Sequence, residues 1–330
     1  MNQCINQPDR FVDESLEGIL LAYPQFYEMA QNDCHAVVHR TTQPHVCIVT
    51  GGGYGHLPLF LGYVGDGLCD GVAVGNVFTS PSAESIMHAV HALKPQKGVL
   101  FLFGNYFGDT MNFEMAAEML SDEDIPSCIV KASDDLASAP REQFEERRGI
   151  AGILFAYKVA GAAASAGYSL DQVERVVKRA IACTATFGVA FSSCTLPGKP
   201  HPMFELADGE MEIGMGIHGE PGVRHGTLEK SEALAEELSA SVVKDLDLQA
   251  DDEVAVLING LGSTSREELF VCYRDVHRYL TVGGIRISRS FVGEYATSID
   301  MAGLSVSLIR LDDEIKKLLA MEASSPFVHF

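Results

Sequence analysis

The chain has 330 residues, of which 47% are hydrophobic, so it is long enough to bury one large core or two of ordinary size. Its formal net charge of -21 at pH 7 argues against nucleic acid and anionic membranes as partners, because both are polyanions and would repel it. The sequence has no long apolar run of the kind that spans a membrane, and its first residues lack the pattern of a signal peptide. We therefore expect a globular, cytoplasmic protein.

The first half of the chain alternates short apolar runs with helical patterns. Strands are predicted at residues 45–50, 71–74, 98–103 and 127–131. After the second of these strands, Ser80 is the predicted N-cap of a helix and Pro81 its first residue. This alternation is typical of a largely parallel sheet flanked by helices.

Two further helices are predicted, at about residues 142–166 and 170–186, with Gly167 ending the first of them. The densest basic cluster of the chain, Arg147 and Arg148, lies within the first helix. Because Glu145 and Glu146 directly precede this cluster, we interpret it as a helix face.

From about residue 188 the sequence becomes richer in loops and glycine. A helix is predicted at residues 228–246, followed by a strand, a glycine turn and a helix that begins with a capping box of Ser265 and Glu268. Strands at residues 286–292 and 304–311 and a short helix complete the sequence.

These elements predict an α/β fold with two domains. We place the boundary near residue 185, where no Pro/Ser-rich linker occurs. The N-terminal domain, residues 1–185, would contain a mostly parallel sheet flanked by helices. The second domain, residues 186–330, would be a smaller α/β sandwich.

The eight cysteines show no CxxC spacing, and several lie in apolar segments. Buried free thiols are therefore expected rather than disulfides or a zinc site.

The stretch VTGGGYGHLPLF, residues 49–60, joins the end of a predicted strand to three glycines and His56. It lacks the third glycine of the dinucleotide-binding fingerprint, and the chain contains no GxxxxGK[ST] phosphate loop. Glycines here indicate a sharp bend and a close approach to the main chain. His56 would follow the carboxyl end of a strand, where open α/β sheets bind ligands, and a purely structural histidine is the alternative.

Asp109 follows the predicted strand at residues 98–103, so a parallel sheet would bring it to the same edge as His56. An acid beside a histidine suits proton transfer with a substrate hydroxyl, whereas a lone aspartate can also be a turn former or a helix cap. His218 lies in GMGIHGEPG, where the surrounding glycines would expose its imidazole.

Five motifs, GGGYGH, FTSP, GNYFGDTMNFE, MEIGMGIHGEPG and GEYATSIDMAGLSVSLI, occur in this order along the chain. With this spacing the sequence resembles the dihydroxyacetone kinase family, specifically its ketone-binding DhaK-type subunit. The resemblance extends over nearly the whole chain, and GIHGEPG is a highly specific string.

The resemblance implies covalent chemistry. In this family the histidine that matches His218 attacks the substrate carbonyl and holds it as a hemiaminal, which requires a neutral imidazole and selects short ketoses and aldoses over polyols such as glycerol. The residues that match His56 and Asp109 act as acid and base, and the aspartate accepts the proton of the hydroxyl that takes the phosphoryl group. The implied substrate-binding residues are Gly52, Gly53 and Gly104.

The resemblance implies no cofactor and no metal on this chain. Stand-alone family members rely on a separate helical DhaL-type subunit that carries ADP or ATP with magnesium, and in many bacteria a phosphotransferase-system protein recharges it. The expected partners are a short-chain ketose, this nucleotide-binding subunit and a second copy of the chain in a homodimer.

Four positions depart from the usual family pattern. GGGSGHEP is GGGYGHLP here, with Tyr54 and Leu57, and KNYTGD is GNYFGD, with Gly104 and Phe107. Fewer polar groups would weaken hydrogen bonding to a small substrate, and the new rings would reshape the pocket or the surface on which a partner docks. Tyr54, Leu57 and Phe107 are therefore candidates for specificity or docking, unless their side chains point into packing.

Two functions follow from the sequence. The first is an active kinase subunit for dihydroxyacetone or another short ketose such as erythrulose. The second is a non-catalytic, ketone-binding paralogue that acts as a coactivator or sensor. His56 and Asp109 favour the enzyme, because a binding protein would need only His218. The identity of the ketose and of the phosphoryl donor, a phosphotransferase-system protein or ATP, stays open.

Overall fold

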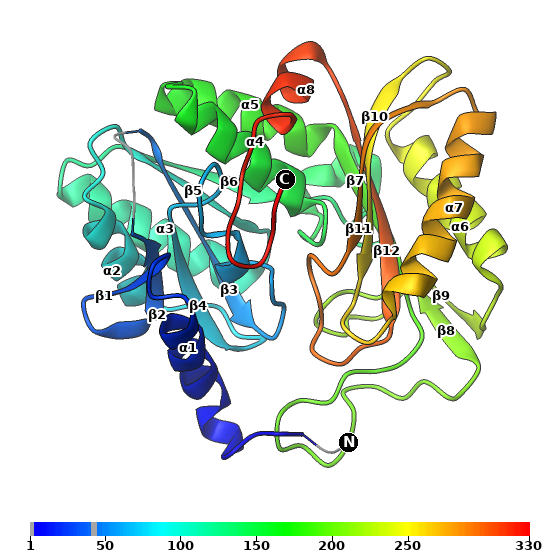
Figure 1. Ribbon diagram of the computed structural model, residues 1–330, viewed down its shortest axis with the longest axis horizontal. Helices are drawn as coiled ribbons and strands as arrows, with labels where there is room; N and C mark the ends of the chain where they lie inside the picture. Colours follow the sequence, from blue (N-terminus) through cyan, green and yellow to red (C-terminus); the bar gives the residue numbers. More distant parts are fainter. Residues whose placement is uncertain (1–2, 41–44) are drawn as a thin grey trace. The chain divides into compact units, whose positions relative to one another are not determined.

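The computed structural model describes residues 3–40 and 45–330. The chain forms two compact units, each built around a six-stranded sheet (Figure 1). One unit comprises Met1–Ala132, Ala156–Arg179 and Lys317–Phe330, and the other comprises Ser133–Phe155 and Ala180–Lys316. Both units are discontinuous in sequence, and the predicted domain boundary near residue 185 stays a prediction.

The sheet of the first unit has the strand order β1-β2-β4-β3-β5-β6. The strands β4, β3, β5 and β6 are parallel neighbours, and β2 and β1 extend the sheet through antiparallel pairing. The strands are β1 (Tyr27–Ala30), β2 (Asp33–His39), β3 (Cys47–Tyr54), β4 (Gly71–Val77), β5 (Val99–Gly104) and β6 (Ser127–Ala132). The predicted mostly parallel sheet is confirmed, and β1 and β2 are additional strands.

Alternation along the central strands builds two buried faces in this unit. On one face, Val49 of β3 and Phe101 of β5 are fully buried in the core that α2 (Ala83–Leu93) and α3 (Phe107–Asp122) complete. Thr50 points to the other face, where its hydroxyl lies 2.6 Å from that of Tyr157. The remaining helical segments before residue 100 are η1 (Pro8–Arg10), α1 (Phe11–Ala22) and η2 (Leu61–Tyr63).

The sheet of the second unit has the order β11-β10-β12-β7-β8-β9. Only β10 and β11 pair in parallel among these strands, as the structure describes them. The strands are β7 (Thr184–Ala190), β8 (Glu210–Ile213), β9 (Arg224–Thr227), β10 (Glu253–Gly260), β11 (Arg286–Gly293) and β12 (Gly303–Arg310). The predicted α/β architecture of this second part of the chain is therefore confirmed. Its sheet is mostly antiparallel.

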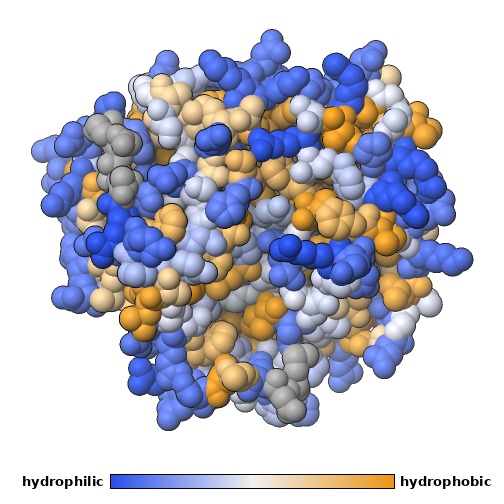
Figure 2. All heavy atoms as spheres, in the orientation of Figure 1, coloured by the Kyte–Doolittle hydropathy of each residue, from blue (hydrophilic) through white to orange (hydrophobic). Residues whose placement is uncertain are grey.

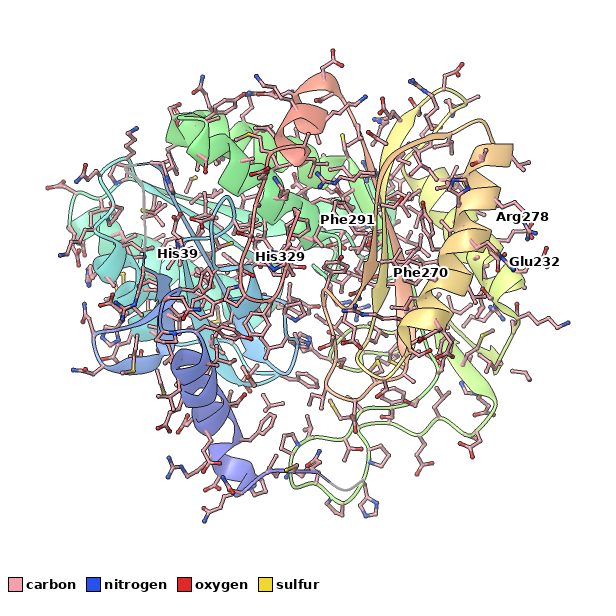
Figure 3. The ribbon with its side chains drawn as sticks, viewed as in Figure 1. His39, Glu232, Phe270, Arg278, Phe291 and His329 are labelled. Carbon is pink, nitrogen blue, oxygen red and sulfur yellow. The ribbon has the colours of Figure 1, made fainter. Side chains whose placement is uncertain are left out.

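Two long helices, α6 (Ser231–Asp245) and α7 (Arg266–Val282), pack their apolar side chains into the core of this second sheet. An ion pair joins them on the outside, where the Arg278 guanidinium lies 2.7 Å from the Glu232 carboxylate (Figure 3). The predicted capping box at the start of α7 is present, because Ser265 and Glu268 each bond to the other's backbone N–H. The short final helix is α8 (Asp313–Leu319).

The N-cap predicted at Ser80 is wrong. Helix α2 begins at Ala83, and the Ser82 hydroxyl accepts the hydrogen bond from the Ser85 N–H at 3.1 Å. Ser80 and Pro81 are instead part of the segment that packs against α3, where the Pro81 carbonyl accepts a bond from the Asn112 side chain at 2.7 Å. Both serines suit an N-cap, and this packing selects the second.

The single helix predicted over residues 142–166 is also wrong. The structure has a 3-10 helix, η3 (Arg141–Glu146), and then α4 (Ile153–Ser165), with non-helical backbone between them. The buried Asp134 carboxylate accepts hydrogen bonds from the N–H groups of Ile150 and Gly152, at 2.9 and 2.8 Å, ahead of α4. Asp134 thus satisfies backbone donors just before the helix begins. Because the acid lies 16 to 18 residues earlier in the chain, the local sequence pattern does not predict this helix start.

Arg147 and Arg148 do not form a helix face, because both lie in the non-helical backbone between η3 and α4. Arg147 is 1% exposed and makes a two-pronged bond to the Asp245 carboxylate, at 2.9 and 2.6 Å. Arg148 bonds to Asp135. The prediction failed because both carboxylate partners lie outside the local sequence.

Helix α5 (Leu170–Ala182) ends earlier than predicted, because Thr184 begins β7 and pairs with β12.

All eight cysteines are free thiols, as expected; Cys47, Cys69, Cys194 and Cys272 are buried, whereas Cys4 is exposed. No helix in the described part of the chain is both long and apolar enough to cross a membrane. Hydrophilic side chains are interspersed with apolar ones over the face seen in Figure 2.

Candidate active site

The carboxyl ends of β4, β3 and β5 lie at one edge of the first sheet, because these three strands are parallel neighbours. Three segments leave the sheet there: residues 55–60 after β3, residues 78–81 after β4, and the start of α3 after β5. His56 is on the first segment and Asp109 is in the first turn of α3. The structure therefore places His56 and Asp109 at the same edge of the sheet.

Two aromatic rings hold the His56 imidazole. The side chain is buried, stacks on Phe78 with ring centroids 4.7 Å apart and contacts the edge of Phe60 at 6.2 Å. Both phenylalanines have left-handed backbone, with φ of 65° at Phe60 and 56° at Phe78, which is unfavourable for a bulky residue. Strained backbone of this kind is concentrated at functional sites.

The glycines of β3 allow other parts of the chain to approach closely. A Cβ on Gly51 would lie 2.5 Å from the Ala73 carbonyl oxygen, and one on Gly52 would overlap the ring of Phe60. A Cβ on Gly53 would lie 2.7 Å from the Thr79 nitrogen. Close packing by itself therefore explains why glycine occupies each of these three positions. The substrate-binding role of Gly52 and Gly53 stays a prediction.

Asp109 is 6% exposed and lies where α3 meets the segment after β4. A Cβ on the neighbouring Gly108 would come within 2.6 Å of the Ser80 hydroxyl, so glycine permits this close contact. Burial raises the pKa of Tyr157, and the charge of Asp109 adds to this effect. The first turn of α3, which carries Asp109, is therefore in close contact with the segment after β4.

Tyr54 points into packing. Its ring is buried and meets the ring of Phe11 edge-on at 6.0 Å, and its hydroxyl is hydrogen-bonded to the Ser15 hydroxyl. Both partners belong to α1, so Tyr54 attaches this helix to β3. Burial raises the pKa of the Tyr54 hydroxyl, which stays protonated at neutral pH.

Replacing Tyr54 with phenylalanine should therefore affect stability and leave substrate selection unchanged. Loss of the hydrogen bond to Ser15 is expected to lower the free energy of unfolding by about 0.5–1.5 kcal/mol. The measurements are urea denaturation and kcat/KM for the two ketoses that the resemblance implies, dihydroxyacetone and erythrulose. A change in the ratio of the two kcat/KM values would show that Tyr54 selects the substrate after all.

The other altered positions lie in different surroundings. Leu57 is half-buried, and Gly104 is buried at the end of β5. Phe107 is 82% exposed at the start of α3. It begins a stripe of exposed apolar side chains spaced four residues apart, which Met111, Met115 and Met119 continue along one face of the helix.

His218 belongs to the second unit, on the loop between β8 and β9. Its side chain is 22% exposed. The loop closes on itself, because the Gly219 N–H bonds to the Gly216 carbonyl at 3.0 Å and the Gly216 N–H bonds to the Glu220 carbonyl at 3.1 Å. Gly219 has φ of 76°, a conformation that glycine adopts without strain.

The Glu220 carboxylate contacts both the backbone and the ring of His218. The His218 N–H donates to Oε2 at 3.0 Å, and ring Nδ1 lies 3.3 Å from Oε1. Burial alone raises the pKa of Glu220, but the hydrogen bond and charge of His218 and the charge of Arg148 outweigh burial and lower this pKa to about 2. Glu220 is not among the predicted site residues, although an acid two residues after the histidine was the available signal.

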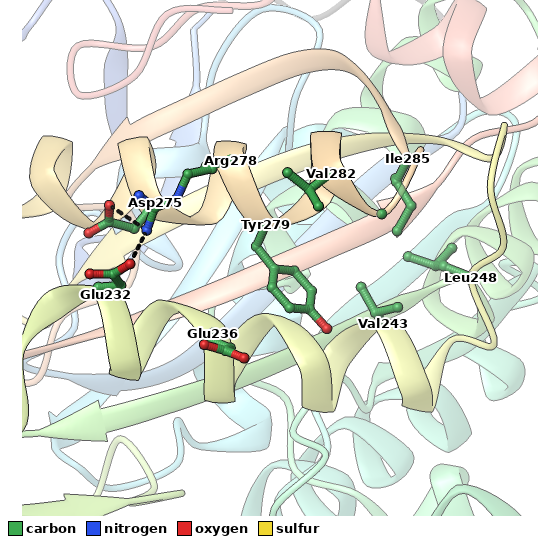
Figure 4. Close-up of a pocket in the computed structure, with 10 residues that line it drawn as sticks. Glu232, Glu236, Val243, Leu248, Asp275, Arg278, Tyr279, Val282 and Ile285 are labelled. Carbon is green, nitrogen blue, oxygen red and sulfur yellow. Dashed lines mark hydrogen bonds and ion pairs between the residues drawn. The ribbon is translucent and has the colours of Figure 1, made fainter.

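Two other features of the described residues, a side-chain cluster and a surface pocket, lie apart from these predicted site residues. Asp13, Cys34 and His35 have potential metal-binding atoms within 4.8 Å of one another, but an ion pair of 3.0 Å between His35 and Asp13 accounts for this arrangement. A surface pocket of about 480 Å³ lies between α6 and α7 (Figure 4). Its lining contains none of the predicted site residues.

Sequence comparisons identify close relatives. Residues 17–327 match the Dak1 domain family. The chain is 43% identical over 329 residues to the dihydroxyacetone-binding subunit DhaK of a PTS-dependent dihydroxyacetone kinase of Listeria innocua, covering 99% of both chains. It is 42% identical to the L-erythrulose kinase of Pectobacterium atrosepticum, of which it spans 56%.

Solved structures that resemble this chain are also proteins of the dihydroxyacetone kinase type. The dihydroxyacetone kinase operon co-activator Dha-DhaQ superposes with a TM-score of 0.88 at 32% identity, covering 96% of this chain and 97% of the other. The dihydroxyacetone kinase of C. freundii gives 0.90 at 30% identity, with 98% of this chain and 59% of that chain covered. The chain therefore belongs to the dihydroxyacetone kinase family, and within it to the DhaK type.

Proposed function

We propose that this chain is the substrate-holding subunit of a kinase for a short ketose, either dihydroxyacetone or a relative such as erythrulose. His218 holds the ketose as a hemiaminal while a nucleotide on a partner subunit supplies the phosphoryl group. The observation that carries this proposal is the placement of a buried histidine and a buried aspartate, His56 and Asp109, at one ligand-binding edge of a parallel sheet.

The environment of His218 supports covalent attachment. An ionised Glu220 can only accept a hydrogen bond, so in the neutral imidazole Nδ1 carries the proton and Nε2 keeps its lone pair. In the addition, Nε2 bonds to the carbonyl carbon and the C=O π pair moves to oxygen. That oxygen gains a proton, the ring loses the one on Nδ1, and nothing is expelled. Glycerol has no carbonyl and cannot react.

Phosphoryl transfer requires little from the protein beyond positioning and proton transfer. The substrate hydroxyl oxygen bonds to phosphorus, the bond from phosphorus to the nucleotide breaks, and the hydroxyl proton passes to Asp109. Because such transition states are loose, an ordinary carboxylate is basic enough. His56, fixed between two aromatic rings, serves as the second proton-transfer group.

The partner subunit needs a docking surface close to Asp109. The exposed stripe of Phe107, Met111, Met115 and Met119 begins two residues before this aspartate and extends along α3. We assign the stripe to a DhaL-type subunit that carries ADP or ATP with magnesium. A homodimer of this chain belongs to the same proposal.

A non-catalytic coactivator is the second candidate. It is favoured by the similarity to the co-activator Dha-DhaQ, at 32% identity over 96% of this chain. Such a protein needs the ketone adduct at His218 but no proton acceptor at the phosphoryl-accepting hydroxyl. The presence of Asp109 and His56 therefore favours the kinase.

The test combines the purified chain with a magnesium- and nucleotide-loaded DhaL-type subunit. Dihydroxyacetone, L-erythrulose, D-erythrulose and glycerol are offered, with either ATP or a phosphoenolpyruvate-driven phosphotransferase system as donor. Intact mass records the adduct, and product analysis records phosphate transfer. We expect an adduct of the full ketose mass and phosphorylation of at least one ketose, but neither with glycerol.

Two results would contradict the kinase. An adduct without phosphate transfer under either donor would support the coactivator. Absence of both adduct and transfer with every ketose would overturn the covalent mechanism itself.

A further inference from the structure

The Glu220 carboxylate is itself held in place by a second ion pair. Arg148 Nη1 lies 3.6 Å from Glu220 Oε2, and Nη2 of the same guanidinium lies 2.8 Å from Asp135 Oδ2. Arg148 Nε also donates to Asp135 Oδ2, at 3.0 Å. The three side chains thus form a line that starts at the His218 ring and ends at a carboxylate that is 3% exposed.

The backbone around Glu220, Arg148 and Asp135 allows these side chains to approach one another closely. A Cβ on Gly216 would overlap the Glu220 carboxylate and come within 2.7 Å of Arg148 Nη1, so only glycine lets both groups approach the loop. The Asp135 N–H bonds to the Arg148 carbonyl at 3.0 Å, and the Ala137 N–H donates to the Asp135 carboxylate at 3.0 Å. Burial raises the pKa of Asp135 to about 6, although Arg148 lowers it, so this buried carboxylate is retained at a cost in solvation.

We propose that Glu220 is a positioning residue for His218 and that Arg148 and Asp135 hold Glu220 in place. The carboxylate keeps the proton of His218 on Nδ1, orients the ring, and stabilises the positive charge that develops on the imidazole as Nε2 attacks the carbonyl carbon. This inference rests on the proposed role of His218 as the covalent group.

A structural role alone would predict a different outcome. If Glu220 only closed the loop through the backbone N–H of His218, its removal would reduce the amount of folded protein and leave the ring unaffected. If Glu220 positions the ring, its removal also leaves the proton of the neutral His218 ring free to occupy either nitrogen. Neutral histidine then also populates the form with the proton on Nε2, in which Nε2 has no free lone pair for the attack on the carbonyl.

The experiment compares the wild-type chain with Glu220→Gln and Glu220→Ala. Glutamine keeps the length of the side chain and one acceptor oxygen but has no charge. Nitrogen-15 NMR of the histidine rings reports which nitrogen of His218 is protonated, and mass spectrometry over time gives the rate of adduct formation with dihydroxyacetone. Thermal denaturation measures the folded fraction of each variant.

We expect the wild-type ring to be protonated on Nδ1 and both variants to shift protonation toward Nε2. Adduct formation should slow about 10- to 100-fold in Glu220→Gln, the range seen when a histidine loses the partner of its other nitrogen, and further in Glu220→Ala. Glu229→Gln is the matched control, because Glu229 follows β9 and pairs with Arg224. This control should match the wild type.

An unchanged tautomer and an unchanged rate in folded Glu220→Gln would overturn the proposal. If Glu220→Ala does not fold, the glutamine variant decides. Failure of the wild-type chain to form any adduct would count against the proposed function, while the tautomer in the resting protein would still test the role of Glu220.

Discussion

His218→Ala is expected to abolish the ketose adduct and to leave the fold intact. Alanine removes the only group proposed to bond to the carbonyl, while the turn at residues 216–220 keeps its backbone hydrogen bonds. Turnover should fall by about 10²-fold or more, since misplacement of a reacting group by roughly 1 Å already costs that much. Intact mass at saturating dihydroxyacetone and the rate with the nucleotide-bearing partner are the two measurements.

His201→Ala is the matched control for this variant. His201 is an exposed histidine in the same unit and is not part of the turn, so both adduct and turnover should be retained. An adduct of unchanged yield in His218→Ala would place the covalent bond on another residue.

Asp109→Asn is expected to separate binding from chemistry. Asparagine has nearly the same shape, so the ketose should still add to His218 to the same extent. It cannot accept the hydroxyl proton, so turnover should fall by about 10²–10⁴-fold, the usual contribution of a general base. Intact mass and single-turnover phosphate transfer measure the two effects in the same preparation.

The control for the aspartate lies on the same helix. Asp122, the last residue of α3, is exposed, and Asp122→Asn should leave transfer unchanged. Unchanged transfer in Asp109→Asn would show that a different group takes the proton. Loss of the adduct in that variant would instead place Asp109 in ketose binding.

Local patterns predicted the elements that depend on neighbouring residues. The apolar runs that became β3, β4 and β5 were predicted because these strands are buried over most or all of their length, so their sequences are almost continuously apolar. Strand β6 is only half-buried but keeps a short apolar run, Cys128–Val130. The edge strand β1 and its neighbour β2 were missed because both contain polar residues that are exposed or half-buried. The four-residue strands β8 and β9 were too short to produce a pattern.

The candidate site divides in the same way. Placing His56 and Asp109 at one edge required only that the strands before them, β3 and β5, be parallel, which the alternation of elements indicated. Tyr54 was left open between a pocket and a packed position. Its contacts with α1, formed by residues about forty positions earlier in the chain, decided for packing.

The sequence by itself therefore determined the family, the order of the elements and the edge of the sheet where His56 and Asp109 lie, because motifs, periodicity and strand order are local information. The tertiary structure alone decided what surrounds these residues. Arg148 was predicted on a helix face, but its guanidinium contacts Asp135 and Glu220. These two residues are 13 and 72 positions away in the sequence (148 − 135 and 220 − 148). Contacts between such distant residues form only when the chain is folded, so no local pattern records them.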